Sequence, residues 1–136
     1  MPYEITWNPP GVVKRFFGFA TGDEFIQSVH EIASHSLFDR IDWIINDFLD
    51  IDDHSIDQSV LDPLAYVRFG AMLTNPSLRV LIVAEDSRLL DLVNRMHAPP
   101  YSGAHETRFF GTMAQAKEWL DTNATRSRQR GFHFLR

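Results

Sequence analysis

Residues 43–49 read WIINDFL, and this segment decides which class of fold the chain can adopt. Five of its seven residues are apolar: Trp43, Ile44, Ile45, Phe48 and Leu49. A nearly continuous apolar run is typical of a strand that helices cover on both faces, as in a parallel sheet. Residues 78–84, LRVLIVA, have the same character and give the clearest strand signal in the chain. The two segments therefore predict an α/β fold.

Turn and capping signals divide the rest of the chain into strands and helices. Strands predicted at residues 3–7 and 12–19 flank the turn NPPG, which gives an N-terminal β-hairpin. The resulting order ββαβαβαβα predicts a mixed, mostly parallel five-stranded sheet with about four helices. The predicted helices begin after Thr21, after Asp57 or Asp62, after Asp86 and after Thr112. Residues 51–57 are expected to form a loop, and residues 107–110 are expected to form the last strand. The second helix is expected to bury Leu64, Val67, Ala71 and Met72.

The composition is that of one globular domain. The chain has 136 residues, of which 44% are hydrophobic and 23% are charged. It contains no cysteine, which excludes disulfides, thiolate zinc sites and cysteine nucleophiles. No apolar run approaches the ~20 residues of a membrane span, and the first residues lack the pattern of a signal peptide. We therefore expect a cytoplasmic protein without a membrane span.

Charge is distributed unevenly along the chain. Residues 1–121 hold nine basic and all eighteen acidic residues, a net charge of −9, and are predicted to form a single domain. An acidic domain argues against a nucleic-acid partner. Residues 122–136 are expected to form a basic C-terminal tail, and Phe132, Phe134 and Leu135 would let it dock onto the domain or a neighbouring subunit, which makes a homodimer one expectation. The basic residues of this tail are Arg126, Arg128, Arg130 and Arg136.

Four segments resemble a known family over residues 3–121. They are VVKRFFGFATGDEF at 12–25, WIINDFLDIDDHSI at 43–56, NPSLRVLIVAEDSRL at 75–89 and RFFGTMAQAKEWL at 108–120. Together they resemble the SpoIIAA-like group of STAS-related proteins, and the resemblance implies a STAS-like fold. In the anti-sigma factor antagonists with this fold, the loop after the third strand carries an Asp-Ser-Ser-Gly motif. A kinase phosphorylates a serine of that motif, and the phosphorylated protein releases the kinase.

The equivalent segment of this chain departs from that motif. Residues 50–55 read DIDDHS, so Asp-Ser-Ser-Gly is absent. Ser55 and Ser59 are the nearest hydroxyl side chains, and neither matches the motif residue for residue. The resemblance therefore implies a binding segment at this place without carrying over the phosphorylation site.

Catalytic and metal-binding patterns are weak in this sequence. The acidic residues Asp47, Asp50, Asp52, Asp53 and Asp57 could supply oxygen ligands, but their spacing does not match a calcium-binding loop, and a solvated turn with a helix cap also explains them. His54 and Ser55 are adjacent, so on an extended segment their side chains point in opposite directions, and no G-x-S-x-G motif occurs. The glycines are isolated and form no phosphate-binding loop. We expect no metal, no cofactor and no enzymatic activity.

The remaining hypothesis is binding, and it has two forms. The first is a regulatory domain that contacts a protein partner through its acidic and apolar residues at the carboxyl ends of the strands. Its predicted partner-binding residues are Asp47, Phe48, Leu49, Asp50, Ile51, Asp52, Asp53 and Ser55. Ser55 is also a candidate phosphorylation site, where a phosphate would add about −1.5 to −2 charge and repel its acidic surroundings. The alternative is a carrier of a small lipophilic ligand, similar to CRAL-TRIO modules, which needs an enclosed apolar pocket of roughly 300 Å³ or more.

Overall fold

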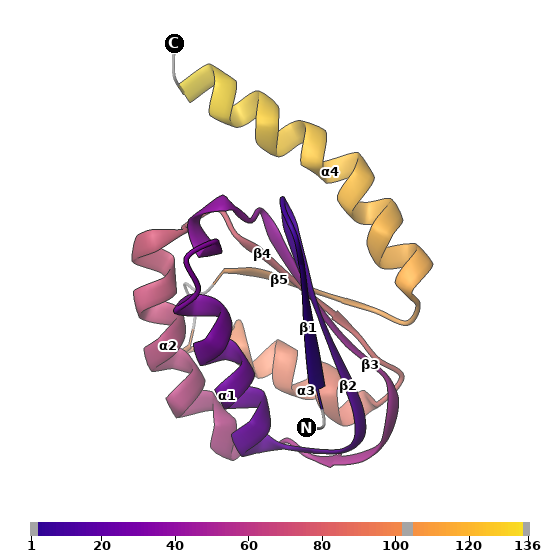
Figure 1. The fold of residues 1–136 in the computed structure, drawn as a ribbon. Helices are drawn as coiled ribbons and strands as arrows, with labels where there is room; N and C mark the ends of the chain where they lie inside the picture. Colours follow the sequence, from indigo (N-terminus) through magenta and orange to yellow (C-terminus); the bar gives the residue numbers. More distant parts are fainter. Residues whose placement is uncertain (1–2, 102–104, 135–136) are drawn as a thin grey trace.

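The computed structural model describes residues 3–101 and 105–134, with side chains described as far as residue 123 (Figure 1). The sheet contains five strands in the order β1-β2-β3-β4-β5, of which β1 is antiparallel to β2 and all other neighbours are parallel. The predicted mixed α/β sheet with an N-terminal hairpin is thus confirmed. The elements are β1 (Tyr3–Asn8), β2 (Gly11–Thr21), α1 (Gly22–Ala33), the 3-10 turn η1 (Phe38–Arg40), β3 (Trp43–Ser55), the 3-10 turn η2 (Gln58–Val60), α2 (Leu61–Thr74), β4 (Arg79–Val83), α3 (Ser87–Met96), β5 (Glu106–Phe110) and α4 (Met113–Phe134).

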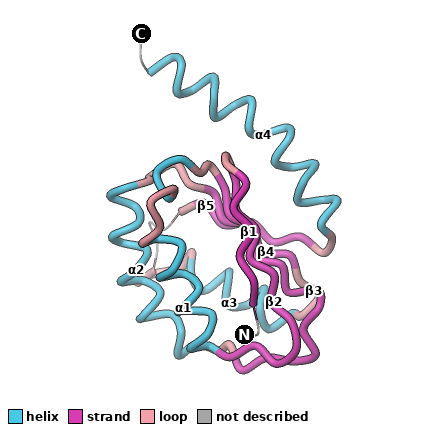
Figure 2. The backbone as a smooth tube through the Cα atoms, in the orientation of Figure 1, coloured by secondary structure: helices cyan, strands magenta, loops and turns pink. Residues whose placement is uncertain are grey.

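Helices cover both faces of the sheet. In Figures 1 and 2, α1, α2 and α3 lie on one face and α4 lies on the other. Phe48 of β3 packs on the first face with Phe16 and Phe25, while Ile45 of the same strand packs on the second with Leu120. The central strand is therefore buried on both sides, as the apolar run at residues 43–49 predicts.

Local capping signals agree closely with the structure. The hydroxyl of Thr21 accepts a hydrogen bond from the backbone N–H of Glu24, and the Glu24 carboxylate accepts one from the N–H of Thr21. This reciprocal pair is the capping box that begins α1. The Asp86 side chain likewise accepts from the N–H of Arg88 at the start of α3. Both helices begin where the sequence predicts.

The predicted loop at residues 51–57 is wrong for most of its length. Strand β3 continues to Ser55, and β2 pairs with it from Phe17 opposite Asp50 to Thr21 opposite Ser55. In Figure 2 the two strands run on together beyond the others. Aspartate has a low propensity for strands, but in this segment the pairing with a neighbouring strand overrides that propensity. The acidic segment is therefore an extended two-stranded ribbon.

The buried face of α2 also differs from the prediction. Leu61, Leu64 and Arg68 are buried, whereas the predicted Val67, Ala71 and Met72 are only partly buried. Apolar residues occur all around this helix, so hydrophobic periodicity does not identify its inner face.

The backbone of residues 122–134 continues α4 as a helix. The sequence predicts a basic tail separate from the domain, whereas the structure shows that residues 122–134 belong to the last helix. The docking predicted for Phe132, Phe134 and Leu135 lies outside the described side chains.

Candidate functional site

The residues predicted to contact a partner lie along one strand, and their side chains have different environments. Phe48 is 4% exposed and stacks on Phe16 with ring centroids 4.5 Å apart, so it is a core residue and does not face a partner. Ile51 packs partly against the same core cluster. Leu49 is exposed, and its backbone N–H donates to the carboxylate of Asp47 at 3.0 Å. The strand therefore offers Leu49, but not Phe48, as an apolar contact.

Two of the acidic residues are already paired with arginines of the same chain. Nε of Arg15 donates to Oδ2 of Asp50 at 2.7 Å, and the same guanidinium reaches Glu4 at 3.4 Å. Nη2 of Arg88 donates to Oδ1 of Asp53 at 2.8 Å. Asp52 is exposed on the same strand extension. The negative charge that this ribbon offers to a basic partner is therefore smaller than the sequence implies.

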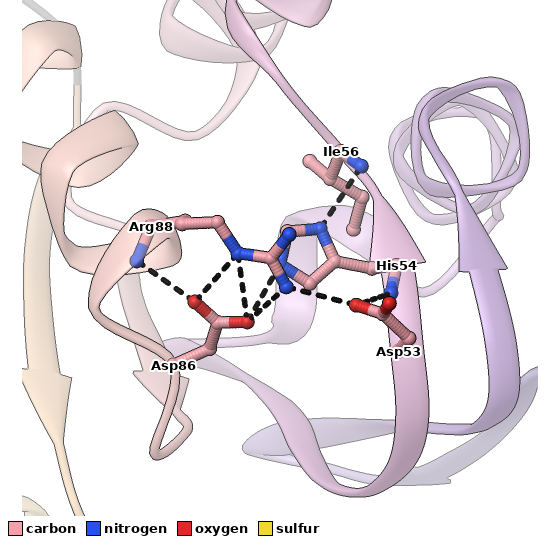
Figure 3. A network of polar contacts seen from close by, with 5 residues as sticks. All are labelled: Asp53, His54, Ile56, Asp86 and Arg88. Carbon is pink, nitrogen blue, oxygen red and sulfur yellow. Dashed lines mark hydrogen bonds and ion pairs between the residues drawn. The ribbon is translucent and has the colours of Figure 1, made fainter.

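A polar network joins the end of β3 to the start of α3, as Figure 3 shows. Arg88 donates to both Asp53 and Asp86, with a distance of 2.6 Å from its Nη2 to Oδ2 of Asp86. These hydrogen bonds are the largest cause that lowers the pKa of Asp86 far below its ordinary value, and Arg88 likewise lowers the pKa of Asp53. Both carboxyl groups therefore remain ionised at neutral pH.

His54 lies buried inside this network, and both of its ring nitrogens are occupied. The backbone N–H of Ile56 donates to Nδ1 at 3.0 Å, and Nε2 lies 3.1 Å from Oδ2 of Asp86. Since Nδ1 accepts, the neutral ring carries its proton on Nε2 and donates it to Asp86. His54 is therefore not free to accept a proton from Ser55. Sequence reasoning predicted Asp86 as a cap but missed its contact with His54, because the two residues are 32 positions apart.

Ser55 is exposed at the end of β3. It lines a surface hollow of about 450 Å³ together with Arg88 and Arg95. Nη1 of Arg95 donates to the side chain of Gln58 at 2.9 Å across this hollow. Ser59, the other nearby hydroxyl, donates to the carboxylate of Asp57 at 2.5 Å. A phosphate on Ser55 would thus share a hollow with the two arginines and also with the carboxylates of Asp57 and Asp91.

A second surface feature lies on α2, outside the residues singled out from the sequence. Tyr66, Phe69 and Leu73 are 82%, 70% and 76% exposed. Their spacing of three and four positions places them on one side of the helix. Phe69 and Leu73 also line a groove of about 430 Å³, whose other walls include Leu61, Leu64, Met72 and Met96. The hydroxyl of Tyr101 donates a hydrogen bond to the carboxylate of Asp62 at 2.5 Å. This bond lies beside the groove and links α2 to the segment that follows α3.

Comparisons with known proteins address the fold. No protein-family model and no curated protein matches the sequence. The structure is similar to the crystal structure of an uncharacterized protein of the DUF3478 family, described as having a SpoIIAA-like fold, from Shewanella loihica PV-4. The TM-score is 0.52 with 15% sequence identity, covering 87% of this chain and 91% of that one. The chain has a SpoIIAA-like fold.

At this level of identity, the similarity extends to the fold alone. It confirms the family resemblance predicted from the four segments as a statement about architecture. The function of this SpoIIAA-like domain must be argued from its own side chains.

Two further features bear on other classes of function. Among the residues that the structure describes, no group of three or more histidine, aspartate or glutamate side chains is arranged to hold a metal ion. Within the same parts of the chain, no helix has both the length and the apolar composition that crossing a membrane requires.

Proposed function

We propose that this SpoIIAA-like domain is a non-enzymatic regulatory domain that binds a protein partner through the outer face of α2 and the end of β3. The observation that carries the proposal is the stripe of Tyr66, Phe69 and Leu73, three large apolar side chains exposed on one helix. Exposed apolar clusters of this kind are common at protein interfaces, and tyrosine is frequent among the residues that contribute most to binding. Helix α2 begins six residues after Ser55, so the stripe and the end of β3 are close in the chain.

The surroundings of the stripe indicate the chemistry of the partner. The groove beside it is lined mainly by leucine and methionine side chains, which adapt to an inserted apolar residue. Exposed Asp52 and Asp57 lie on the segment leading to the helix, and Asp62 lies in its first turn. A helical segment with apolar residues on one face and lysine or arginine at its edge would complement this surface.

The test is native mass spectrometry of the untagged protein recovered gently from its own host. The wild-type domain is compared with Phe69→Ser and Leu73→Ser, which change exposed side chains and leave the core intact. Leu90→Ser is the matched control, because Leu90 is an exposed leucine on a different helix, α3. The proposal predicts a protein complex with the wild type and Leu90→Ser that is lost with the α2 variants. A complex that survives both α2 substitutions would contradict it.

One observation favours a second function, the binding of a small lipophilic ligand. The groove of about 430 Å³ exceeds the roughly 300 Å³ at which ligand pockets begin, but it is open to the surface and not enclosed. The test is displacement of a fluorescent fatty-acid probe, with Ala65→Trp as the discriminating variant because Ala65 lines the groove. Saturable displacement that Ala65→Trp abolishes would support a carrier, and the absence of saturable displacement would count against it.

A further inference from the structure

A small internal cavity lies between the sheet and its helices, away from the end of β3. Its volume is about 70 Å³, enough for roughly five water-sized groups. Most of its lining is apolar, from Phe25, Val29 and Ile32 of α1 and neighbouring residues. Lys14 and Asn46 also line it, as do the polar residues Arg68, His105 and Thr107. Buried polar groups in an apolar cavity need a partner, which can be a water molecule, an ion or a ligand.

Lys14 is the most unusual of the lining residues. Its side chain, which is 2% exposed, donates a hydrogen bond from Nζ to Oγ of Ser28 at 3.0 Å. Ser28 uses its own hydroxyl proton to bond the backbone oxygen of Phe25 at 2.6 Å, so it only accepts from the amine. Throughout the described ranges, no carboxylate forms an ion pair with Lys14. Burial lowers the pKa of Lys14 to about 7, while the charge of Glu31 acts in the opposite direction.

Asn46 provides the second observation. It lies opposite Lys14 in the parallel pairing of β2 and β3, and it is 2% exposed. Its amide group donates to the backbone oxygen of Leu81 at 3.4 Å. Its Oδ1 atom has no hydrogen-bond partner among the residues described. The cavity wall therefore holds an unused acceptor on the strand next to the lysine.

We propose that Lys14 captures a small apolar aldehyde in this cavity as a reversible imine. The amine lone pair attacks the carbonyl carbon and forms a C–N bond, and the oxygen takes a proton from nitrogen. The resulting carbinolamine then loses its hydroxyl group with the remaining N–H proton as water, which leaves a C=N bond. No oxidant or reductant is needed. A buried lysine amine that forms no ion pair with a carboxylate among the described residues is suited to this chemistry.

The polar groups near the amine can accommodate the hydroxyl of the carbinolamine. Ser28 accepts from Lys14, and Asn46 presents an unpaired acceptor. The hydroxyl of a carbinolamine can donate to that acceptor. The apolar lining accommodates an alkyl chain, and the volume limits that chain to a few carbon atoms.

The cavity borders the groove on α2. Leu64, Arg68 and Met96 line both the groove and the cavity, so these side chains separate the two spaces. Methionine is flexible enough to move aside. The proposal does not depend on binding of a protein partner.

The experiment is reductive trapping with butanal and sodium cyanoborohydride at pH 7, followed by intact-mass measurement and peptide mapping. The chain contains two lysines, Lys14 and Lys117, and Lys117 is exposed on α4, so it is an internal control. We expect a butyl group on Lys14 to form at least about tenfold faster than on Lys117, because a hydrated amine is mostly protonated at this pH. Labelling confined to Lys117 and the α-amino group, or labelling of Lys14 only in denaturant, would overturn the proposal.

Two further measurements separate capture in the cavity from general reactivity. Pyrenecarboxaldehyde is too large for the cavity and should leave Lys14 unlabelled, and equal labelling by both aldehydes would contradict the assigned site. Lys117→Arg should retain the fast adduct. Lys14→Met should lose it, with circular dichroism showing whether this variant is folded. The wild-type peptide map decides the question even if Lys14→Met does not fold.

Discussion

Nε2 of His54 lies 3.1 Å from Oδ2 of Asp86, and this contact ties the end of β3 to the first turn of α3. His54 is buried, and Asp86 is also the N-cap of α3 and a partner of Arg88. One carboxylate therefore satisfies a helix end, a buried ring and a guanidinium. The strand extension is anchored at this point, next to the hollow that Ser55 lines with Arg88 and Arg95.

Removing the Asp86 carboxylate should destabilise the domain. Asp86→Ala removes the helix cap and leaves the buried His54 ring without its acceptor, a combined loss of about 2 kcal/mol in the free energy of unfolding. Urea unfolding measures the effect, with exposed Glu85→Ala as the control, which should change stability by less than about 0.5 kcal/mol. Equal effects of the two substitutions would show that the network contributes little.

Acid should weaken the same network. The folded-state pKa values of Asp53 and Asp86 are lowered, chiefly by hydrogen bonds from Arg88, so their contribution is complete above the unfolded pKa of about 4. It is lost progressively as the pH falls below that value. We expect urea midpoints to decrease between pH 5 and pH 2, and Arg88→Gln to flatten this part of the curve. An unchanged slope in Arg88→Gln would assign the acid sensitivity to other groups.

Lys14 should make the free energy of unfolding depend on pH in the neutral to alkaline range. Its folded pKa of about 7 lies below the unfolded value near 10.4, so the unfolded chain binds more protons between these two values. Stability should therefore rise with pH from about 7 to 10. Lys14→Met should remove the rise, and Lys117→Met should retain it. If the wild-type curve is flat over this range, Lys14 is hydrated in solution.

Phosphorylation can be imitated at Ser55. Ser55→Glu adds a negative charge that competes with Asp53 and Asp86 for Arg88 and loosens the link between β3 and α3. We expect at least about a fivefold loss of affinity for the partner identified by native mass spectrometry, roughly 1 kcal/mol. Ser55→Ala should bind normally. Unchanged affinity in Ser55→Glu would remove Ser55 from the regulatory proposal.

The same substitution at two glycines should have opposite effects. Gly18 has φ of 65° beside a register shift between β2 and β3, so Gly18→Ala should cost about 1 kcal/mol of stability. Gly70 lies exposed in α2, where an added Cβ meets nothing within 4 Å, so Gly70→Ala should add about 0.5–1 kcal/mol. Thermal unfolding compares them. A stabilising Gly18→Ala would contradict the strain argument.

The sequence by itself determined the architecture of this protein. The apolar runs at residues 43–49 and 78–84 correspond to β3 and β4, and the capping residues Thr21 and Asp86 begin α1 and α3. These features are predictable because each depends on residues a few positions apart, through strand alternation, helix periodicity or a local hydrogen bond. Their order predicts the mixed α/β sheet that the structure shows.

Only the tertiary structure decided which side chains are buried, paired or free at the surface. Asp53 and Asp86 meet Arg88 in one network, Lys14 and Asn46 share a cavity, and the stripe on α2 that includes Tyr66 is left uncovered. Each of these outcomes depends on elements that are far apart in the chain. Local pattern cannot predict them, because the energy of burying a charge or exposing an aromatic ring depends on the neighbours that the fold supplies.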